Sequence, residues 1–311
     1  MIMNKCFIIT VDTEGDNLWA SHHGEPITTR NTHFLPRFQN LCNEYGFKPV
    51  YLTNYEMACD LDFAAEAKQW LQANQCEIGL HVHGWNNPPH YPLEGDKYAH
   101  AYLYEYPEQI IKEKLSVTQN LIKKNFGVTP ISHRAGKWAM NDVYFKVLNE
   151  IGIKVDCSYC PGVDWSSTIG ATKGGTNYRH ASHSPKIVNG VLEVPMTIRV
   201  GRWKGWQKLK RIIKTIIYGN PIWLRPASST LQQMKRLVDY AELFYRQDYL
   251  MFMIHSSEVM PGGSPYFEDK NAVEKEYETM RELFDYVSRK GYVGCTLAEY
   301  YGRQIESNTT H

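Results

Sequence analysis

Two short runs of this sequence hold side chains of the kinds that bind metal ions. Asp12 and Glu14 follow the first apolar segment of the chain, and His81 and His83 close another apolar segment. In a β-strand, residues two positions apart leave the same face, so the members of each pair are expected to point the same way. Converging imidazole and carboxylate groups suit a divalent metal. Taken alone, the histidine pair fits a hydrogen-bonded structural role equally well.

Two more ionisable residues stand where apolar segments end. Arg134 follows the segment Val128–His133, and His255 follows the continuous apolar segment Tyr249–Ile254. If these segments are parallel strands, their carboxyl ends meet at the edge where barrel enzymes hold catalytic residues. A surface ion pair for Arg134 and a core position for His255 are the alternatives, but four strand ends with such groups favour one shared site. His133 faces away from Arg134 and is expected to be structural.

The segments that must position these groups alternate between strand and helix patterns. Several of the strands are apolar throughout, which predicts a parallel sheet covered by helices on its faces. Seven to eight such units in 311 residues predict an α/β fold, a distorted and TIM-like (β/α) barrel. The expected strands are Lys5–Val11, Lys48–Thr53, Glu77–His83, Val128–His133, Ile153–Cys157, Val191–Ile198, Tyr249–Ile254 and Tyr292–Thr296. The expected helices are Phe34–Tyr45, Leu61–Ala73, Pro107–Phe126, Asn141–Glu150, Ser229–Gln247 and Asn271–Lys290.

No internal repeat or linker divides the chain, so residues 1–306 are expected to form a single domain. Two segments, 84–105 and 199–228, are longer than ordinary connections and are expected to be insertions in the barrel. Loops of such length are usually functional. Residues 307–311 are expected to be a disordered tail.

Composition narrows the class of protein and of ligand. The net charge of +1 gives no overall field that would attract nucleic acid. The seven cysteines are scattered, the first residues lack the pattern of a signal peptide, and no apolar stretch is long enough to cross a membrane. These features predict a cytoplasmic protein. Aromatic residues reach 13%, and Trp85, Trp138 and Trp165 are candidates to stack on sugar rings, although each alone fits a core position.

One segment has a biased charge. Residues 202–225 contain seven basic and no acidic residues, and Leu209, Ile212, Ile213, Ile216 and Ile217 recur on one helical face. Trp203, Trp206 and Trp223 flank this face. A basic amphipathic helix with aromatic flanks can lie at a membrane interface. A helix packed on the barrel with a solvated basic face explains the pattern equally well.

Taken together, the motifs resemble those of the polysaccharide deacetylase family, also known as the NodB-homology or carbohydrate esterase 4 group. The resemblance covers most of the chain. It implies a distorted (β/α) barrel and metal-dependent hydrolysis of an N-acetyl group on a sugar. The motifs that carry it are Thr10-Val-Asp-Thr-Glu14, Glu77-Ile-Gly-Leu-His81, Arg134-Ala-Gly-Lys-Trp138, Val155-Asp-Cys-Ser158, Leu192-Glu-Val-Pro195 and the strand that ends at His255.

The resemblance also implies roles for single residues. Asp12 is expected to be the catalytic base, Arg134 to orient it, and His255 to be the general acid. His81 is expected to be a metal ligand. The family's two other ligand positions fall on Thr13 and Trp85, so Glu14 and His83 are expected to take their places. The chain is therefore identified as a divergent member, with a divalent metal as cofactor, zinc first and nickel, cobalt or manganese as alternatives.

The expected function is removal of an N-acetyl group from a sugar or glycan precursor by metal-activated water. A lipid-linked sugar would suit a membrane-facing insertion. Two alternatives remain open. One is a hydrolase of another small, cyclic amide, and the other is a glycan-binding protein without activity, since Thr13 and Trp85 replace ligands.

Overall fold

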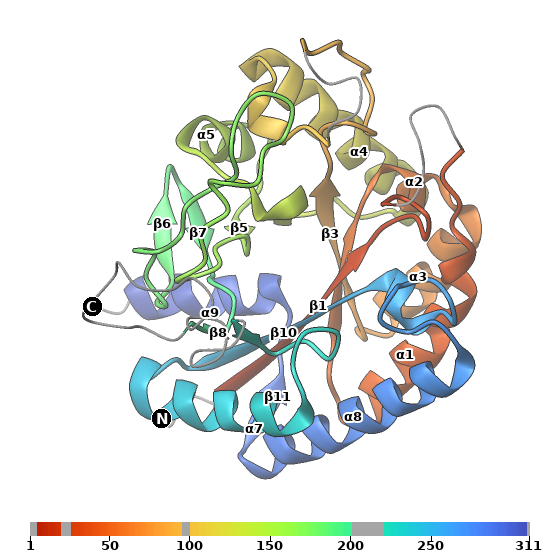
Figure 1. The fold of residues 1–311 in the computed structure, drawn as a ribbon, viewed down its shortest axis with the longest axis vertical. Coiled ribbons are helices and arrows are strands. Elements are labelled where there is room, and N and C mark those ends of the chain that lie inside the picture. The colour runs from red at the N-terminus through yellow and green to blue at the C-terminus, as the bar shows by residue number, and fades with distance from the viewer. Residues whose placement is uncertain (1–4, 20–25, 95–99, 201–220, 310–311) are drawn as a thin grey trace, which may run out of the picture.

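β1 (Lys5–Thr13) pairs with three other strands of a curled, mostly parallel sheet (Figure 1). The computed structural model describes residues 5–19, 26–94, 100–200 and 221–309. The strands of this sheet follow the order β10-β1-β2-β3-β4-β5-β7-β6, and β11 pairs with the start of β1 beside β2. Only β6 runs antiparallel to its neighbour. The bounds are β2 Pro49–Thr53, β3 Glu77–Val82, β4 Ser132–Ala135, β5 Val155–Asp156, β6 Lys186–Val188, β7 Val191–Glu193, β10 Tyr249–His255 and β11 Tyr292–Gly294. 

Helices cover the outside of the curled sheet, as the alternating sequence pattern predicts (Figure 1). Side chains cap several of them at their first turn: Asn54, Asp60, Asn141, Thr230 and Asp269 each accept a hydrogen bond from a backbone amide three residues on. The helices are α1 Leu35–Glu44, α2 Tyr55–Cys59, α3 Leu61–Gln72, α4 Glu108–Phe126, α5 Asp142–Glu150, α7 Leu231–Tyr240, α8 Lys270–Arg289 and α9 Leu297–Thr309. A separate two-stranded sheet joins β8 (Ile198–Arg199) to β9 (Ile222–Trp223).

Irregular segments, rather than a further strand, close the barrel at the outer edge of β10. Within the described residues, that edge pairs with no strand. Instead, the amide of Met251 donates to the hydroxyl of Thr197, and the amide of Met253 donates to the carbonyl of Leu224. The expected distorted, TIM-like (β/α) barrel with seven to eight parallel strands is thus confirmed. The irregular segments beside β10 are the distortion.

The side chains of β1 alternate between two environments, the outer core beneath the helices and the interior of the barrel. Phe7, Ile9 and Val11 pack outward against the helices. Cys6 and Ile8 point into the barrel, where they join the inward residues of β2 and β10. Because side chains alternate, the next inward positions along β1 carry polar groups at its carboxyl end.

Several element boundaries differ from the sequence prediction. The strand expected over Val191–Ile198 ends at Glu193, because Pro195 has no amide to donate to a neighbouring strand. The helix expected over Ser229–Gln247 is α7, followed by a wider π-helical turn over Ala241–Tyr245 that ends at Arg246 in a left-handed conformation. α9 extends to Thr309, into the segment from residue 307 that was expected to be a tail.

The two expected insertions are described to different extents. In 84–105, a short 3₁₀ turn forms at Leu103–Glu105, and residues 95–99 are outside the described parts. The amphipathic helix expected over residues 209–217 also lies outside the described residues. No helix in the described parts of the chain is long and apolar enough to cross a membrane.

Candidate metal and catalytic site

Four strand ends meet at one place, as their parallel pairing requires. β1 pairs with β10 so that Asp12 lies opposite His255, and β3 pairs with β4 so that His81 lies opposite Arg134. All four side chains point toward the interior at the carboxyl ends of the strands, where parallel barrels hold their functional groups. The sequence prediction that these residues share one site therefore agrees with the geometry.

Glu14, His81 and His83 form a buried cluster of three metal-capable side chains. Their ligand atoms all lie within 4.8 Å of one another, and no other such group of three occurs in the described residues. Glu14 Oε2 is 2.8 Å from His83 Nε2 and 3.5 Å from His81 Nε2, and the two Nε2 atoms are 3.0 Å apart. Ligands of a tetrahedral zinc ion at about 2.0–2.1 Å are separated by roughly 3.3 Å, so these donor spacings fit one metal ion.

Hydrogen bonds and burial set the orientation and the protonation states of the cluster residues. Nδ1 of His81 donates a hydrogen bond to the carbonyl oxygen of Arg134 at 2.8 Å, which leaves Nε2 to bind a metal. Burial lowers the pKa of His83 to about 4, despite the opposing effect of Glu14, so its imidazole is neutral at pH 7. Burial acts to raise the pKa of Glu14, but hydrogen bonds to both histidines outweigh it and hold the pKa well below the usual value. Glu14 and His83 thus have the charge states that metal ligands need. For His81, burial lowers the pKa, but Asp12 and Glu14 outweigh it and raise the pKa, so a metal would displace a proton from its Nε2.

Thr13 does not compete for this role. Its hydroxyl is buried and donates to the carbonyl of Val11 at 2.9 Å, pointing away from the cluster. Gly136 fits against the other side of His83, because a Cβ at this position would lie 2.5 Å from Nδ1 of His83 and 2.7 Å from the carbonyl of Val82. Only a glycine leaves space for the imidazole there.

Asp12 is held as a carboxylate by a buried arginine. Nη1 of Arg134 donates to Oδ1 of Asp12 at 2.6 Å, and Nη2 donates to the hydroxyl of Thr10 at 2.9 Å. Burial disfavours the charged form of Asp12, but Arg134, then His81 and His255, outweigh burial and lower its pKa. The other oxygen, Oδ2, lies 3.9 Å from Nε2 of His255. An ionised carboxylate with one oxygen free is suited to accept a proton.

His255 is oriented by an ion pair that approaches from behind it. Its Nδ1 lies 2.9 Å from Nη2 of Arg225 and 3.3 Å from Oε1 of Glu258. Arg225 and Glu258 pair with each other at 2.5 Å. Burial alone would raise the pKa of Glu258, but Arg225 and His255 lower it to about 2. This arrangement turns Nε2 of His255 toward Asp12 and toward Glu14, whose Oε1 is 3.7 Å away.

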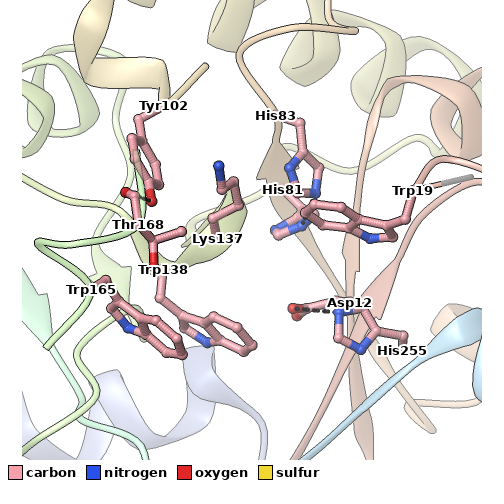
Figure 2. A pocket seen from close by; sticks show the side chains of 10 residues that line it. All are labelled: Asp12, Trp19, His81, His83, Tyr102, Lys137, Trp138, Trp165, Thr168 and His255. Carbon is pink, nitrogen blue, oxygen red and sulfur yellow. Dashed lines mark hydrogen bonds and ion pairs between the residues drawn. The ribbon is translucent and has the colours of Figure 1, made fainter. Parts of the chain in front are cut away.

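A pocket of about 170 Å³ opens onto these groups. Figure 2 shows Asp12, His81, His83, His255 and Trp19 on one side of the pocket. Tyr102, Trp138, Trp165 and Thr168 lie on the opposite side, with Lys137 between the two groups. One wall therefore carries ionisable groups and the other is largely aromatic.

The three tryptophans expected at the substrate site have different positions. Trp138 and Trp165 line the pocket and stack in parallel, with ring centroids 6.1 Å apart and planes 7° apart. Trp85 is not among the lining residues, because it packs beside His83 and stacks on His100 at 4.4 Å. Trp19 occupies the pocket on that side, and its indole nitrogen donates to Glu14 at 2.7 Å.

Two residues of the basic segment 202–225 belong to the site rather than to an outer surface. Trp223 is 7% exposed and packs on Trp138, and Arg225 pairs with Glu258. For Trp223, the expectation of a membrane-facing flank is wrong, because the residue is buried on β9.

Sequence reasoning missed other residues of the pocket, including Trp19, Tyr102, Lys137 and Thr168. These residues stand in loops, where no period links sequence to direction. The available signals were the long segment 84–105, which contains Tyr102, and the motif Arg134-Ala-Gly-Lys-Trp138, which contains Lys137. His133 has the expected structural role, because its ring is fully buried between Asp156 at 2.6 Å and the hydroxyl of Tyr144 at 2.9 Å.

Comparison with solved structures identifies the fold. A candidate polysaccharide deacetylase from Mycobacterium smegmatis superimposes with a TM-score of 0.53 at 14% sequence identity, covering 99% of this chain and 93% of that one. A 4-alpha-glucanotransferase from Thermococcus litoralis superimposes with a TM-score of 0.57 at 12% identity, but this chain, 96% of which is aligned, spans only 40% of it. A family 4 acetyl xylan esterase from Clostridium thermocellum, solved with a cobalt ion, has a TM-score of 0.48 at 14% identity over 96% of this chain and 91% of that one.

No protein-family profile matches the chain, and no curated protein matches it significantly in sequence. The likeness is thus one of fold, which several activities share. The chain shares the fold of a polysaccharide deacetylase, as its motifs predict.

Proposed function

We propose that this protein is a metal-dependent hydrolase that removes the acetyl group from an N-acetylated sugar of a glycan or glycan precursor. The observation that carries the proposal is the buried Glu14, His81 and His83 cluster beside Asp12 and His255 in one pocket. A metal cluster, a paired carboxylate and an oriented histidine together meet the requirements of amide hydrolysis.

The three cluster residues would hold the metal through Oε2 of Glu14 and Nε2 of each histidine. When bound, a divalent ion such as zinc, or nickel, cobalt or manganese in its place, supplies a Lewis acid that polarises the acetyl carbonyl and makes water more acidic. Nδ1 of His81 stays bonded to the carbonyl of Arg134, which fixes the orientation of that ligand.

The remaining residues move protons. Asp12, kept ionised by Arg134, accepts a proton at Oδ2 from the attacking water. His255, as a histidinium whose Nδ1 proton lies beside Oε1 of Glu258, then donates its Nε2 proton to the nitrogen of the leaving sugar amine and becomes a neutral imidazole. Each proton transfer of this kind contributes about 10²–10⁴-fold to the rate. The faces of Trp138 and Trp165 provide a surface on which a sugar ring stacks.

Acetate release from a panel of N-acetylated and O-acetylated sugars, with each of the four metals, tests this function. We expect release from an N-acetylated member, a loss of at least 100-fold in Asp12→Asn and His81→Ala, and no change in His33→Ala, an exposed histidine outside the pocket. The same panel includes a cyclic amide, the substrate of the alternative hydrolase.

Metal titration distinguishes the hydrolase from a glycan-binding protein without activity. A stoichiometric divalent metal that raises the melting temperature in the wild type but not in His83→Ala supports the hydrolase. Absence of any bound or titratable metal would refute the proposed function and favour the binding protein.

A cytoplasmic, lipid-linked substrate is a further part of the proposal, and it depends on the basic residues between Arg202 and Lys214. We expect the protein to cosediment with anionic liposomes at low salt and to dissociate as salt rises. A protein that stays in the supernatant at low salt would remove the membrane contact from the proposal.

A further inference from the structure

Lys137 is a cation placed in the substrate pocket without an acidic partner. Its ammonium donates to the carbonyl of His100 at 2.7 Å and lies 4.0 Å from the centre of the Tyr102 ring. Among the described residues, no carboxylate lies within ion-pair distance of it. An ammonium has three donors, and only one of them is used.

The nearby Glu105 does not neutralise this lysine directly. Its two oxygens accept hydrogen bonds from the backbone amides of Tyr102, Ala171, Thr172 and Lys173. These bonds tie the loop that follows Gly170 to the start of the Tyr102 turn. The carboxylate of Glu105 therefore shapes the wall of the pocket, while the ammonium of Lys137 stays available inside it.

The backbone holds Lys137 in this position at a conformational cost. Lys137 and Trp138 both have positive φ, 58° and 51°, which is rare for residues with a side chain. Two such residues in succession place the lysine between the two walls of the pocket, where Figure 2 shows it. Strained backbone of this kind is retained where the surrounding structure fixes it, and it clusters at ligand sites.

The aromatic wall offers two more donors. The indole nitrogens of Trp138 and Trp165 are buried and have no hydrogen-bond partner in the described chain, although both residues line the pocket. Buried donors are normally paired, and a ligand oxygen is the partner that such a pocket admits. The single carboxylate in the lining, Asp12, is already paired with Arg134.

We infer that the pocket binds a sugar that carries an anionic group, a carboxylate or a phosphate, and that Lys137 recognises this group. The inference rests on the proposed function, because it assigns the substrate class of the same site. The acetamido group lies at the cluster wall, and the anionic group lies toward Lys137 and the two indole donors. Two of the ammonium's donors are free to bind the oxygens of the anion.

Three sugars that differ only at C6 test the inference. They are the methyl glycosides of N-acetylglucosamine, its 6-uronic acid and its 6-phosphate. The full-length protein is supplemented with zinc, and NMR of the acetyl methyl signal reports binding and any released acetate together. We expect at least one anionic sugar to bind about tenfold tighter than the neutral one, the size of a charge-assisted hydrogen bond.

Variants of Lys137 assign the effect to its charge. In Lys137→Met, we expect the anionic sugars to bind no more tightly than the neutral sugar. Lys137→Arg, which keeps the charge, and Lys68→Met, which removes an exposed lysine on α3, should both retain the preference.

Equal binding of all three sugars by the wild type overturns the inference, as does a preference that persists in Lys137→Met. An equal loss of binding for all three sugars in Lys137→Met overturns it too, since the lysine would then only shape the pocket. A preference for the uronic acid alone or the phosphate alone identifies the anion. Charge-dependent binding without acetate release would refute the hydrolase and leave the inference standing, so the two failures are distinct.

Discussion

The guanidinium of Arg134 lies 2.6 Å from the carboxylate of Asp12, and neither group contacts solvent appreciably. Removal of one partner of such a buried ion pair destabilises the folded protein, because the remaining charge stays in an interior that solvates it poorly. In this protein, the same pair keeps the proposed base ionised. Stability and activity therefore depend on one contact.

Replacement of Arg134 by methionine is expected to lower the free energy of unfolding by about 3–5 kcal/mol at pH 7. Asp12 has a folded-state pKa below its unfolded value near 4, so its contribution to stability is present above that pH and is lost as the pH falls. In Arg134→Met this contribution should disappear. Urea unfolding at pH 7 measures the change, and Arg134→Met combined with Asp12→Asn should lose less than the sum of the single variants. Strict additivity would contradict the coupling.

Substitution of Gly136 by alanine is expected to displace His83, because the new Cβ would meet Nδ1 at 2.5 Å. The rise in melting temperature with added zinc should therefore shrink in Gly136→Ala. Gly302 is the matched control, since it lies in α9 and a Cβ there meets nothing within 4 Å. Gly302→Ala should keep the full zinc effect and gain roughly 0.5–1 kcal/mol of helix stability. An unchanged zinc effect in Gly136→Ala would mean that His83 is not a ligand.

Arg225 is predicted to position His255 rather than to contact substrate. Arg225→Met should lower kcat about 10–100-fold and change KM little, because a misplaced proton donor slows the chemical step. Arg225→Lys should restore part of the rate through its remaining charge. Arg179→Met is the control, since this arginine is mostly exposed and pairs with Asp164 at the surface. A rise in KM with normal kcat would instead assign Arg225 to substrate binding.

Glu276 makes stability depend on pH. Its buried carboxyl group has no hydrogen-bond partner among the described residues. Burial, with the charge of Glu258, raises its pKa to about 9 against the opposing effect of Arg225. A raised pKa means that stability present below pH 4.5 is lost as the pH rises toward 9. Glu276→Gln should therefore gain stability relative to the wild type by up to about 1.4 kcal/mol per pH unit across this range.

Urea unfolding at pH 5, 7 and 9 measures this difference. Glu278→Gln, two residues away on the same helix and exposed, should follow the wild type at every pH. Parallel curves for Glu276→Gln and the wild type would show that Glu276 ionises freely in the folded protein.

The site residues at the strand ends were predictable, because side chains alternate between the two faces of a β-strand. Asp12, Glu14, His81 and His255 all stand at or just after the ends of apolar runs, and an alternation of two fixes their common direction. The barrel followed from the same alternation of strands and helices.

The loop-borne part was not predictable, since each position depends on contacts distant in sequence. Arg225 reaches His255 from 30 residues away, and its charge pattern predicted an exposed helix instead. Lys137 depends on a left-handed backbone conformation that no residue type in its motif signals. Trp85 was a candidate to stack on a sugar ring because it is aromatic, and in the structure its ring stacks on His100.

The inward face of β1 becomes more polar along the strand. Cys6 and Ile8 lie in the apolar interior of the barrel, Thr10 follows, and Asp12 lines the pocket at the carboxyl end. The opposite face of the same strand carries Phe7, Ile9 and Val11 into the outer core. Deletion of one residue within this strand would exchange the two sets, placing the carboxylate of Asp12 among the helices and phenylalanine in the pocket. The alternation of side chains along this nine-residue strand thus determines both the packing of the outer core and the position of the Asp12 carboxylate.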